Sequence, residues 1–186
     1  MKQTVGPMKI FKIIGITLLI IIGFVLAVGL MAPSEANLER SITIEASASN
    51  VFNELKGIKE INAWSPWRKI DPEGTKYTYS GPELGVGSKV DWKSEHDDVG
   101  VGSQEIIEIS VNSKVKTKMF FGGMDTPSYA DFILIEENGS TKVIWTFSGD
   151  MGANPMNRLF GLLLDNILGP FYEEGLQNLK SLVESK

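Results

Sequence analysis

The feature that most constrains this chain is an apolar run near its amino terminus. Residues 13–32 are twenty consecutive residues without a charged side chain, and thirteen of them are Leu, Ile, Val or Phe. As an α-helix, such a run spans about 30 Å, the thickness of the hydrocarbon core of a bilayer. At roughly −0.3 to −0.6 kcal/mol for each of these side chains, insertion is favoured by on the order of 4–8 kcal/mol, from which the glycines and Thr17 subtract only a part. The run therefore predicts a transmembrane helix over residues 13–32.

The residues around this run predict its orientation. Lys9 and Lys12 precede it, within reach of the lipid head groups, and Pro33 ends the helix. Residues 1–32 hold three of the chain's 18 basic residues and none of its 23 acidic ones, so the remainder carries a net charge of −8. Because positively charged flanks stay in the cytoplasm, we expect a single-pass protein of the cell membrane with a cytoplasmic amino terminus and an extracytoplasmic carboxy-terminal domain.

A cleaved signal peptide is the alternative interpretation of the same run. The apolar stretch of a signal peptide usually has roughly 7–15 residues, which is shorter than this one, and Pro33 crowds the small-x-small site at residues 34–36. A retained anchor is therefore the preferred interpretation. It divides the chain into a cytoplasmic stub over residues 1–12, a transmembrane helix over 13–32, a linker over 33–37 and a folded domain over 38–186.

The composition excludes several classes of function for this domain. Hydrophobic residues make up 42% of the chain and charged residues 22%, which are values of a globular protein. The chain has no cysteine and one histidine, so disulfide scaffolds, iron–sulfur or zinc–cysteine sites and thiol nucleophiles are excluded, and no metal or other cofactor is expected. A net charge of −5 gives no bulk attraction for nucleic acid. A protein partner is left open.

Hydrophobic periodicity predicts an α+β domain. Residues 38–44 alternate as a strand, Ser47 or Ser49 is placed to cap a short helix, and Ile58, Ile61 and Trp64 indicate a second short helix. Several strands follow, each with apolar residues two apart, in the pairs and triplets Tyr77 and Tyr79; Val90 and Trp92; Ile107, Ile109 and Val111; Val115, Thr117 and Met119; Val143, Trp145 and Phe147. Hairpin turns are predicted at residues 112–113 and 138–139.

A long helix closes the chain. Asn154 is a predicted cap with Pro155 at the first helical position, and Pro170 predicts a kink. One stripe of this helix is apolar and comprises Phe160, Leu163, Leu164, Ile167, Phe171, Leu176, Leu179 and Val183. A curved antiparallel sheet has only this helix as a large apolar partner, and wrapping around it leaves a gap at the open end of the sheet. We expect function to reside in that gap.

Short motifs along the domain resemble those of a known superfamily. They occur in the order 39–44 (ERSITI), 46–52 (ASASNVF), 64–67 (WSPW), 71–72 (DP), 164–170 (LDNILGP) and 175–180 (GLQNLK). In this order and spacing they resemble the START-like superfamily, also called SRPBCC or polyketide cyclase/dehydrase-like, and within it the bacterial branch with an amino-terminal transmembrane helix. The resemblance covers about residues 38–186. It implies a helix-grip fold with an internal cavity for a hydrophobic small molecule or lipid, and it implies no particular reaction.

The candidate ligand-binding residues are mainly aromatic residues and methionines. They are Trp64, Trp67, Arg68, Tyr77, Tyr79, Trp92, Met119, Phe121, Phe132, Trp145, Phe147, Met156, Phe160, Leu163 and Leu164. The alternative for each apolar member is that it fills the core, but so many large flat side chains around one helix seldom interlock without gaps. Arg68 meets an anionic head group in the functional interpretation and pairs with Asp71 in the structural one.

Three further features have weaker interpretations. Residues 121–127 contain two glycines and form either a mobile lip over the cavity or an ordinary connection. His96, within the polar run 94–98, is expected to be solvated rather than to bind a metal. Asp165 interrupts an apolar stretch and is the weak candidate for a catalytic acid or base.

We therefore predict a membrane-anchored, non-catalytic binding domain for a hydrophobic ligand. The alternatives are a cyclase- or hydratase-type enzyme acting on an apolar carbonyl compound, and a protein-interaction module of the cell envelope.

Overall fold

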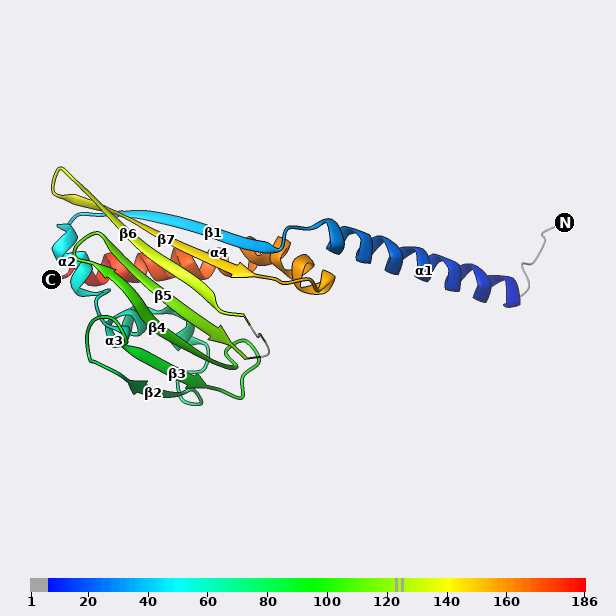
Figure 1. Ribbon diagram of the computed structural model, residues 1–186, viewed down its shortest axis with the longest axis horizontal. Coiled ribbons are helices and arrows are strands. Elements are labelled where there is room, and N and C mark those ends of the chain that lie inside the picture. The colour runs from blue at the N-terminus through cyan, green and yellow to red at the C-terminus, as the bar shows by residue number, and fades with distance from the viewer. Residues whose placement is uncertain (1–6, 123, 125) are drawn as a thin grey trace.

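The computed structural model of the chain describes residues 7–122, 124 and 126–186, with side chains from residue 9 onward (Figure 1). Half of the expected cytoplasmic stub, including Lys2, lies outside these residues, as do Gly123 and Asp125 of the expected lip. Helix α1 (Pro7–Met31) projects from one end of the domain, and its residues 9–31 are long and apolar enough to cross a membrane.

The domain that follows α1 is α+β, as predicted, with one sheet and one long carboxy-terminal helix. Its elements are β1 (Glu35–Ile44), α2 (Ala48–Asn53), α3 (Ile58–Trp64), the 3₁₀ helix η1 (Pro66–Lys69), β2 (Lys76–Ser80), β3 (Lys89–Lys93), β4 (Val101–Ser110), β5 (Lys114–Phe121), β6 (Ser128–Glu137), β7 (Ser140–Asp150) and α4 (Pro155–Glu184). The seven strands are antiparallel neighbours in the order β1-β7-β6-β5-β4-β3-β2. The sheet curves around α4 (Figure 1), which is the helix-grip arrangement.

Local sequence signals account for many of these boundaries. The Ser47 hydroxyl accepts a hydrogen bond from the backbone N–H of Asn50 and caps α2, and the Asn154 side chain accepts one from Met156 N–H and caps α4. Asn138 and Gly139 have φ angles of 53° and 84°, the left-handed pair that a two-residue hairpin requires between β6 and β7. These predicted caps and turns are confirmed.

Strand β1 begins earlier than expected. It starts at Glu35 rather than at Leu38, because β7 extends to Asp150 and offers pairing partners to the first residues of β1. Most of the expected linker is therefore part of the sheet. The chain passes from the end of α1 into β1 within a few residues, which leaves little slack between the apolar helix and the domain.

Strand β4 departs from the predicted alternation. Ile107, Ile109 and Val111 were expected to share one face. Ile109 packs against the core, but Ile106 rather than Ile107 is fully buried, and Val111 is 73% exposed because it lies in the turn after β4. The pairing of β4 with β5 shifts between Ile106 and Glu108, which indicates a β-bulge. An extra residue in one strand reverses the alternation beyond it. Even-numbered residues such as Ile106 therefore face the core before the bulge, and the odd-numbered Ile109 faces it after the bulge.

Helix α4 is continuous through Pro170, and only its second half follows the predicted stripe. Leu176, Leu179 and Val183 are buried against the sheet as expected. In the first half Leu164 is buried, whereas Phe160, Leu163 and Ile167, which were expected to point inward, are exposed.

Candidate functional site

A cavity of about 270 Å³ lies between the sheet and the elements α3, η1 and α4. It is at the lower end of the range of ligand pockets, roughly 300–1,000 Å³, and its lining is mostly apolar. The lining residues are Ile61, Asn62, Trp64, Ser65, Trp67, Tyr77, Val90, Trp92, Asp98, Val99, Gln104, Met119, Phe121, Trp145, Phe147, Leu168 and Tyr172. The domain core therefore does not close completely at this end of the sheet.

Lining residues on the neighbouring strands β3, β4 and β5 lie opposite one another, so that they form rows across the sheet. Gln104 lies between Val90 and Met119, and Gly102 lies between Trp92 and Phe121, in adjacent rows of β3, β4 and β5. Gly102 is required there because a Cβ atom at this position would overlap the indole ring of Trp92, and the glycine lets that ring lie across β4. Trp92 and Phe121 then meet edge to face with ring centroids 6.1 Å apart.

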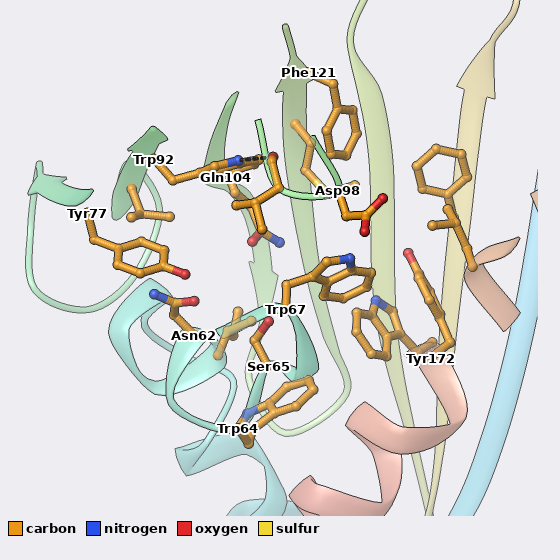
Figure 2. Close-up of a pocket in the computed structure, with 17 residues that line it drawn as sticks. Asn62, Trp64, Ser65, Trp67, Tyr77, Trp92, Asp98, Gln104, Phe121 and Tyr172 are labelled. Atoms are coloured by element: carbon orange, nitrogen blue, oxygen red, sulfur yellow. Dashed lines mark hydrogen bonds between the residues drawn. The ribbon is translucent and has the colours of Figure 1, made fainter. Parts of the chain in front are cut away.

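Stacked aromatic rings form one wall of the cavity. Trp145 of β7 stacks on Tyr172 of α4 with centroids 3.9 Å apart, and Trp67 of η1 meets both rings edge to face. On the side away from α4, Trp145 packs against Phe132 with centroids 5.0 Å apart. Figure 2 shows Trp67 beside Tyr172, with the Tyr172 hydroxyl directed from α4 into the group of lining side chains. The wall is rigid because each ring is held by at least two others.

The WSPW motif is anchored at both ends of its turn. The Trp64 indole N–H donates to the carbonyl oxygen of Glu54 at 3.2 Å, and the Asn178 amide donates to the carbonyl oxygen of Trp64 at 3.0 Å. Pro66 starts η1 and is buried, which places Trp67 directly over α4, where its ring stacks on Phe171. The motif thus closes one side of the cavity with two tryptophans.

A few polar groups face this apolar space. The Trp145 indole nitrogen is buried, and no residue that the structure describes accepts its hydrogen. Tyr172 is 2% exposed, and burial raises the pKa of its hydroxyl with no opposing hydrogen bond. The Gln104 amide donates to the Thr117 hydroxyl at 3.0 Å, and the amide of Asn62 donates to the Tyr79 hydroxyl at 2.6 Å. Two donors, on Trp145 and Tyr172, are therefore available to a ligand.

Burial acts on both lining tyrosines. It raises the pKa of Tyr172 far above its ordinary value, and it also raises the pKa of the half-buried Tyr77 against the opposing effect of the nearby Arg68 charge. A tyrosine hydroxyl is already neutral at physiological pH at its ordinary pKa of about 10, and burial moves both groups further from ionisation. They are suited to donate a hydrogen bond to a ligand and not to remove a proton from one.

The loop after β3 forms a rim of the cavity. The Trp92 indole N–H donates to the carbonyl oxygen of Val99 at 3.3 Å and so holds the loop against the sheet (Figure 2). Asp98 brings a carboxylate to this rim with a side chain that is 77% exposed. His96 is on the outer side of the loop, with its Nδ1 accepting from the Asp98 backbone N–H at 3.2 Å. Among the described residues, no three His, Asp or Glu side chains are arranged to hold a metal ion.

Eight of the predicted site residues line the cavity, and seven do not. Those that line it are Trp64, Trp67, Tyr77, Trp92, Met119, Phe121, Trp145 and Phe147. Phe132 and Leu164 are buried in the core beside it, and Arg68 and Tyr79 are exposed outside it. The Arg68 guanidinium lies over the Tyr77 ring, 5.8 Å from its centroid, while the Asp71 carboxylate accepts from the Ser94 hydroxyl instead. Met156, Phe160 and Leu163 point away from the cavity, contrary to prediction.

Asp165 also lies away from the cavity. Its carboxylate accepts two hydrogen bonds from the Arg40 guanidinium, at 2.9 and 3.2 Å, and these hold its pKa below the ordinary range. Arg40 of β1 also donates to Glu173 at 2.8 Å, so the three residues form a surface network between β1 and α4. Asp165 is not placed to act on a molecule in the cavity.

Sequence reasoning missed the polar part of the lining. Tyr172 follows Phe171 in the predicted helix and differs from it only in facing the sheet, a distinction that depends on the rotation of the helix. Gln104 lies before the bulge in β4, on the face that also carries Ile106. The alternation Gly102, Gln104 and Ile106 was the available signal, but the predicted strand began only at Ile107.

Comparison with known proteins gives one sequence match that covers most of the chain. Residues 35–184 match the model of a family described as polyketide cyclase/dehydrase and lipid transport. No curated protein matches the sequence.

Solved structures with the same architecture are numerous and distant in sequence. Norcoclaurine synthase from Thalictrum flavum, in complex with dopamine and hydroxybenzaldehyde, is similar with a TM-score of 0.62 at 13% identity, over 84% of this chain and 91% of that chain. The di-domain ARO/CYC StfQ from the steffimycin biosynthetic pathway gives 0.59 at 9% identity, over 81% of this chain but only 51% of that chain. A protein from Thermobifida fusca gives 0.58 at 16% identity, over 79% and 92%. At these identities the likeness shows the fold alone.

Proposed function

The chain belongs to the polyketide cyclase/dehydrase and lipid transport family, and we propose that its domain binds a hydrophobic small molecule or lipid that carries a hydrogen-bond acceptor. The observation that carries this proposal is the buried Trp145 indole N–H, which lacks a protein acceptor on a side chain that lines an apolar cavity. An unsatisfied buried donor costs about 1–3 kcal/mol, and a ligand carbonyl, carboxylate or hydroxyl would recover it. Tyr172 offers a second donor at the same wall.

The apolar lining supplies the affinity in this proposal, and the polar groups supply the selectivity. A ligand that buries ~300 Å² of apolar surface gains on the order of 7 kcal/mol, from which association entropy takes back several. Shape alone therefore gives modest binding. A compound with an acceptor at Trp145 and Tyr172 is preferred over a plain hydrocarbon of equal size, because the hydrocarbon leaves both donors unpaired.

The role that we propose is binding rather than catalysis. The titratable side chains of the described lining are Tyr77, Asp98 and Tyr172. The tyrosines are neutral at physiological pH, and burial raises the pKa of both further, while Asp98 stands exposed at the rim and not in the cavity interior. A cyclase or hydratase needs a buried base close to the substrate carbonyl, and this lining favours binding over that alternative.

We also propose that α1 holds the domain at the outer face of the cell membrane, with the amino terminus in the cytoplasm. The uncharged run, the preceding lysines and the acidic domain support this arrangement. An anchor of this kind keeps the cavity beside the bilayer, into which a hydrophobic ligand partitions.

A photo-crosslinking experiment tests the binding proposal. The full chain in lipid nanodiscs is exposed to a long-chain fatty acid bearing a diazirine, and the labelled peptides are identified by mass spectrometry. We expect adducts on the segments that carry Trp92, Phe121 and Tyr172. Absence of adducts on these segments, with labelling confined to α1, would contradict the proposal.

One matched pair of variants and one single variant sharpen this test. Val99→Trp narrows the rim and is expected to abolish cavity labelling, whereas Val101→Trp enlarges an exposed residue outside the lining and is expected to leave it unchanged. Trp145→Phe keeps an aromatic ring but removes the donor, so labelling at limiting probe should require about tenfold more fatty acid. Equal labelling of Val99→Trp and Val101→Trp would show that the probe does not occupy the cavity.

A further inference from the structure

The rim of the cavity carries charge of one sign. Among the described residues of the lining, Asp98 has the one carboxylate, and none is a lysine, an arginine or a histidine. Arg68, which lies over the ring of the lining residue Tyr77, is exposed outside the cavity. The rim is therefore a negatively charged opening into an apolar space.

The loop that carries Asp98 is held by hydrogen bonds across its base and within its turn. The backbone N–H of Ser94 donates to the carbonyl oxygen of Gly100 at 2.8 Å, and that of Val99 donates to the carbonyl oxygen of His96 at 3.0 Å. Together with the bond from the Trp92 indole to the same loop, these contacts fix its backbone against the sheet. Asp98 is thereby kept at the rim.

The charge of this carboxylate is not neutralised within the described part of the chain. His96 Nδ1 lies 3.9 Å from the Asp98 Oδ2, but it accepts the Asp98 backbone N–H at 3.2 Å and so carries no proton there. Lys93, at the end of β3, pairs with Glu95 at 3.7 Å instead. No lysine or arginine that the structure describes forms an ion pair with Asp98. The negative charge is thus available to a group from outside the chain.

Aromatic rings line the same space as this carboxylate. Trp67 of η1, Trp92 of β3 and Phe121 of β5 share the lining with Asp98, and in the view of Figure 2 the carboxylate lies between Phe121 and Trp67. The face of an aromatic ring attracts a cation, and tryptophan does so most strongly. The carboxylate and the rings therefore favour the same sign of charge in a ligand.

An organic cation suits this rim better than a metal ion. Calcium takes about six to eight oxygen ligands, and among the described residues no three His, Asp or Glu side chains are arranged to hold a metal. An ammonium group is satisfied by one carboxylate, water and ring faces. The apolar part of the same molecule would then lie in the cavity.

The two ends of the cavity differ in what they offer a ligand. The inner wall has the indole N–H of Trp145, which is 5% exposed and lacks a described acceptor, and the hydroxyl of Tyr172. The rim has the Asp98 carboxylate, on a side chain that is 77% exposed. A molecule that satisfies both ends has an acceptor inside and a positive charge outside, whereas an anionic group at the rim is repelled.

We propose that the ligand of the cavity carries an ammonium group, which lies at the rim against Asp98 and the rings of Trp67 and Trp92. The group belongs either to a free hydrophobic amine or to the head group of a lipid. This inference rests on the proposed binding function of the cavity, to which it adds the sign of the ligand's charge and the direction in which the ligand lies.

Two photoprobes of equal length test the proposal: a decyl chain with a diazirine that ends either in a primary amine or in a hydroxyl group. The full chain is labelled in nanodiscs at neutral pH, where an alkyl amine is protonated. Labelling of the segments with Trp92, Phe121 and Tyr172 is divided by labelling of α1, which corrects for the partition of each probe into the bilayer. We expect half-maximal labelling at about fivefold less amine than alcohol.

The lipid of the nanodisc distinguishes the two sources of the ammonium group. Phosphatidylglycerol has no ammonium group, whereas phosphatidylcholine carries one in its head group. A preference for the amine probe in both lipids supports a free amine as the ligand. A preference that is present in phosphatidylglycerol and lost in phosphatidylcholine supports a lipid head group, because the lipid then competes with the probe.

Three variants assign the preference to the rim. Asp98→Asn keeps the size of the side chain and removes its charge, so the two probes should label it equally, with the alcohol unchanged from the natural chain. Asp97→Asn removes the same charge from an exposed neighbour outside the lining and should keep the preference for the amine. Val99→Trp, which narrows the rim, should lose labelling by both probes.

The possible failures of this proposal and of the binding function are distinct. Equal labelling by amine and alcohol in phosphatidylglycerol nanodiscs, or an equal loss of preference in Asp97→Asn and Asp98→Asn, would overturn the ammonium site and leave hydrophobic binding standing. A preference for the amine that survives Asp98→Asn would do the same. Labelling of α1 alone, by both probes, would overturn the binding function and the ammonium site together.

Discussion

The two halves of α4 belong to one continuous helix but have opposite relations to the sheet. The second half is gripped by it, with Leu176 and Leu179 at most 2% exposed in the same core as Ile44 and Val143. The first half borders the cavity with Leu168 and turns Met156, Phe160, Leu163 and Ile167 outward. One end of the fold is thus packed solid and the other is left open, and the comparison separates residues that hold the domain together from residues that border the cavity or lie on the surface.

The largest expected difference between the two halves is in stability. Leu179→Ala removes a fully buried side chain and should lower the free energy of unfolding by about 2–5 kcal/mol. Leu163→Ala makes the same chemical change at an exposed position and should alter it by no more than about 0.5 kcal/mol. Urea unfolding of the full chain in detergent micelles, followed by circular dichroism, measures both. Similar losses would mean that Leu163 is packed against protein in solution.

A second comparison uses two of the three glycines of α4, Gly175 and Gly161, each of which lies against another part of the domain. A Cβ atom at Gly175 would be 2.7 Å from the Trp145 ring, which Tyr172 and Phe132 hold in place, so Gly175→Ala should cost about 1–3 kcal/mol and reduce cavity labelling. Gly161→Ala meets the flexible Met151 side chain at 3.0 Å, and the gain in helix propensity of about 1 kcal/mol offsets the crowding. Thermal unfolding and photo-labelling of both variants test the contrast; equal effects would mean that the aromatic wall is not rigid.

The joint between α1 and α4 is expected to have a smaller effect on stability. Arg158→Gln removes hydrogen bonds to the end of α1 and should lower the free energy of unfolding by about 1 kcal/mol. Arg68→Gln is the control, since its loss costs only the exposed contact with Tyr77, about 0.5 kcal/mol. Urea unfolding measures both variants, and equal stability of Arg158→Gln and the natural chain would show that these hydrogen bonds do not hold the joint.

The smallest expected effect concerns the ion pair that marks the boundary between the halves. Arg40 holds the pKa of Asp165 below its ordinary value, so the pair stabilises the fold above the carboxyl's unfolded pKa of about 3.9. This contribution is lost as the pH falls through the lowered folded pKa. Asp165→Asn should therefore be slightly less stable than the natural chain at pH 7, and the difference should vanish in acid. A difference that grows on acidification would exclude the pair as its source.

Much of the fold could be predicted because its signals are local. The apolar run of α1, the caps at Ser47 and Asn154 and the turn at Asn138-Gly139 each depend on a few neighbouring residues. The alternation in β5 also holds, with Val115, Thr117 and Met119 buried. The aromatic part of the cavity was predicted for the same reason, because large flat side chains on the inner face of a curved sheet are found by periodicity.

The sequence by itself therefore determined the order of the elements, the apolar helix and the aromatic character of the cavity. Only the tertiary structure decided which side of the first half of α4 is covered, where the bulge in β4 reverses the alternation, and that Tyr172 and the Trp145 indole N–H share the cavity wall. The physical reason is that periodicity shows which residues share a face. Whether protein, lipid, ligand or water covers that face depends on elements that are distant in the chain.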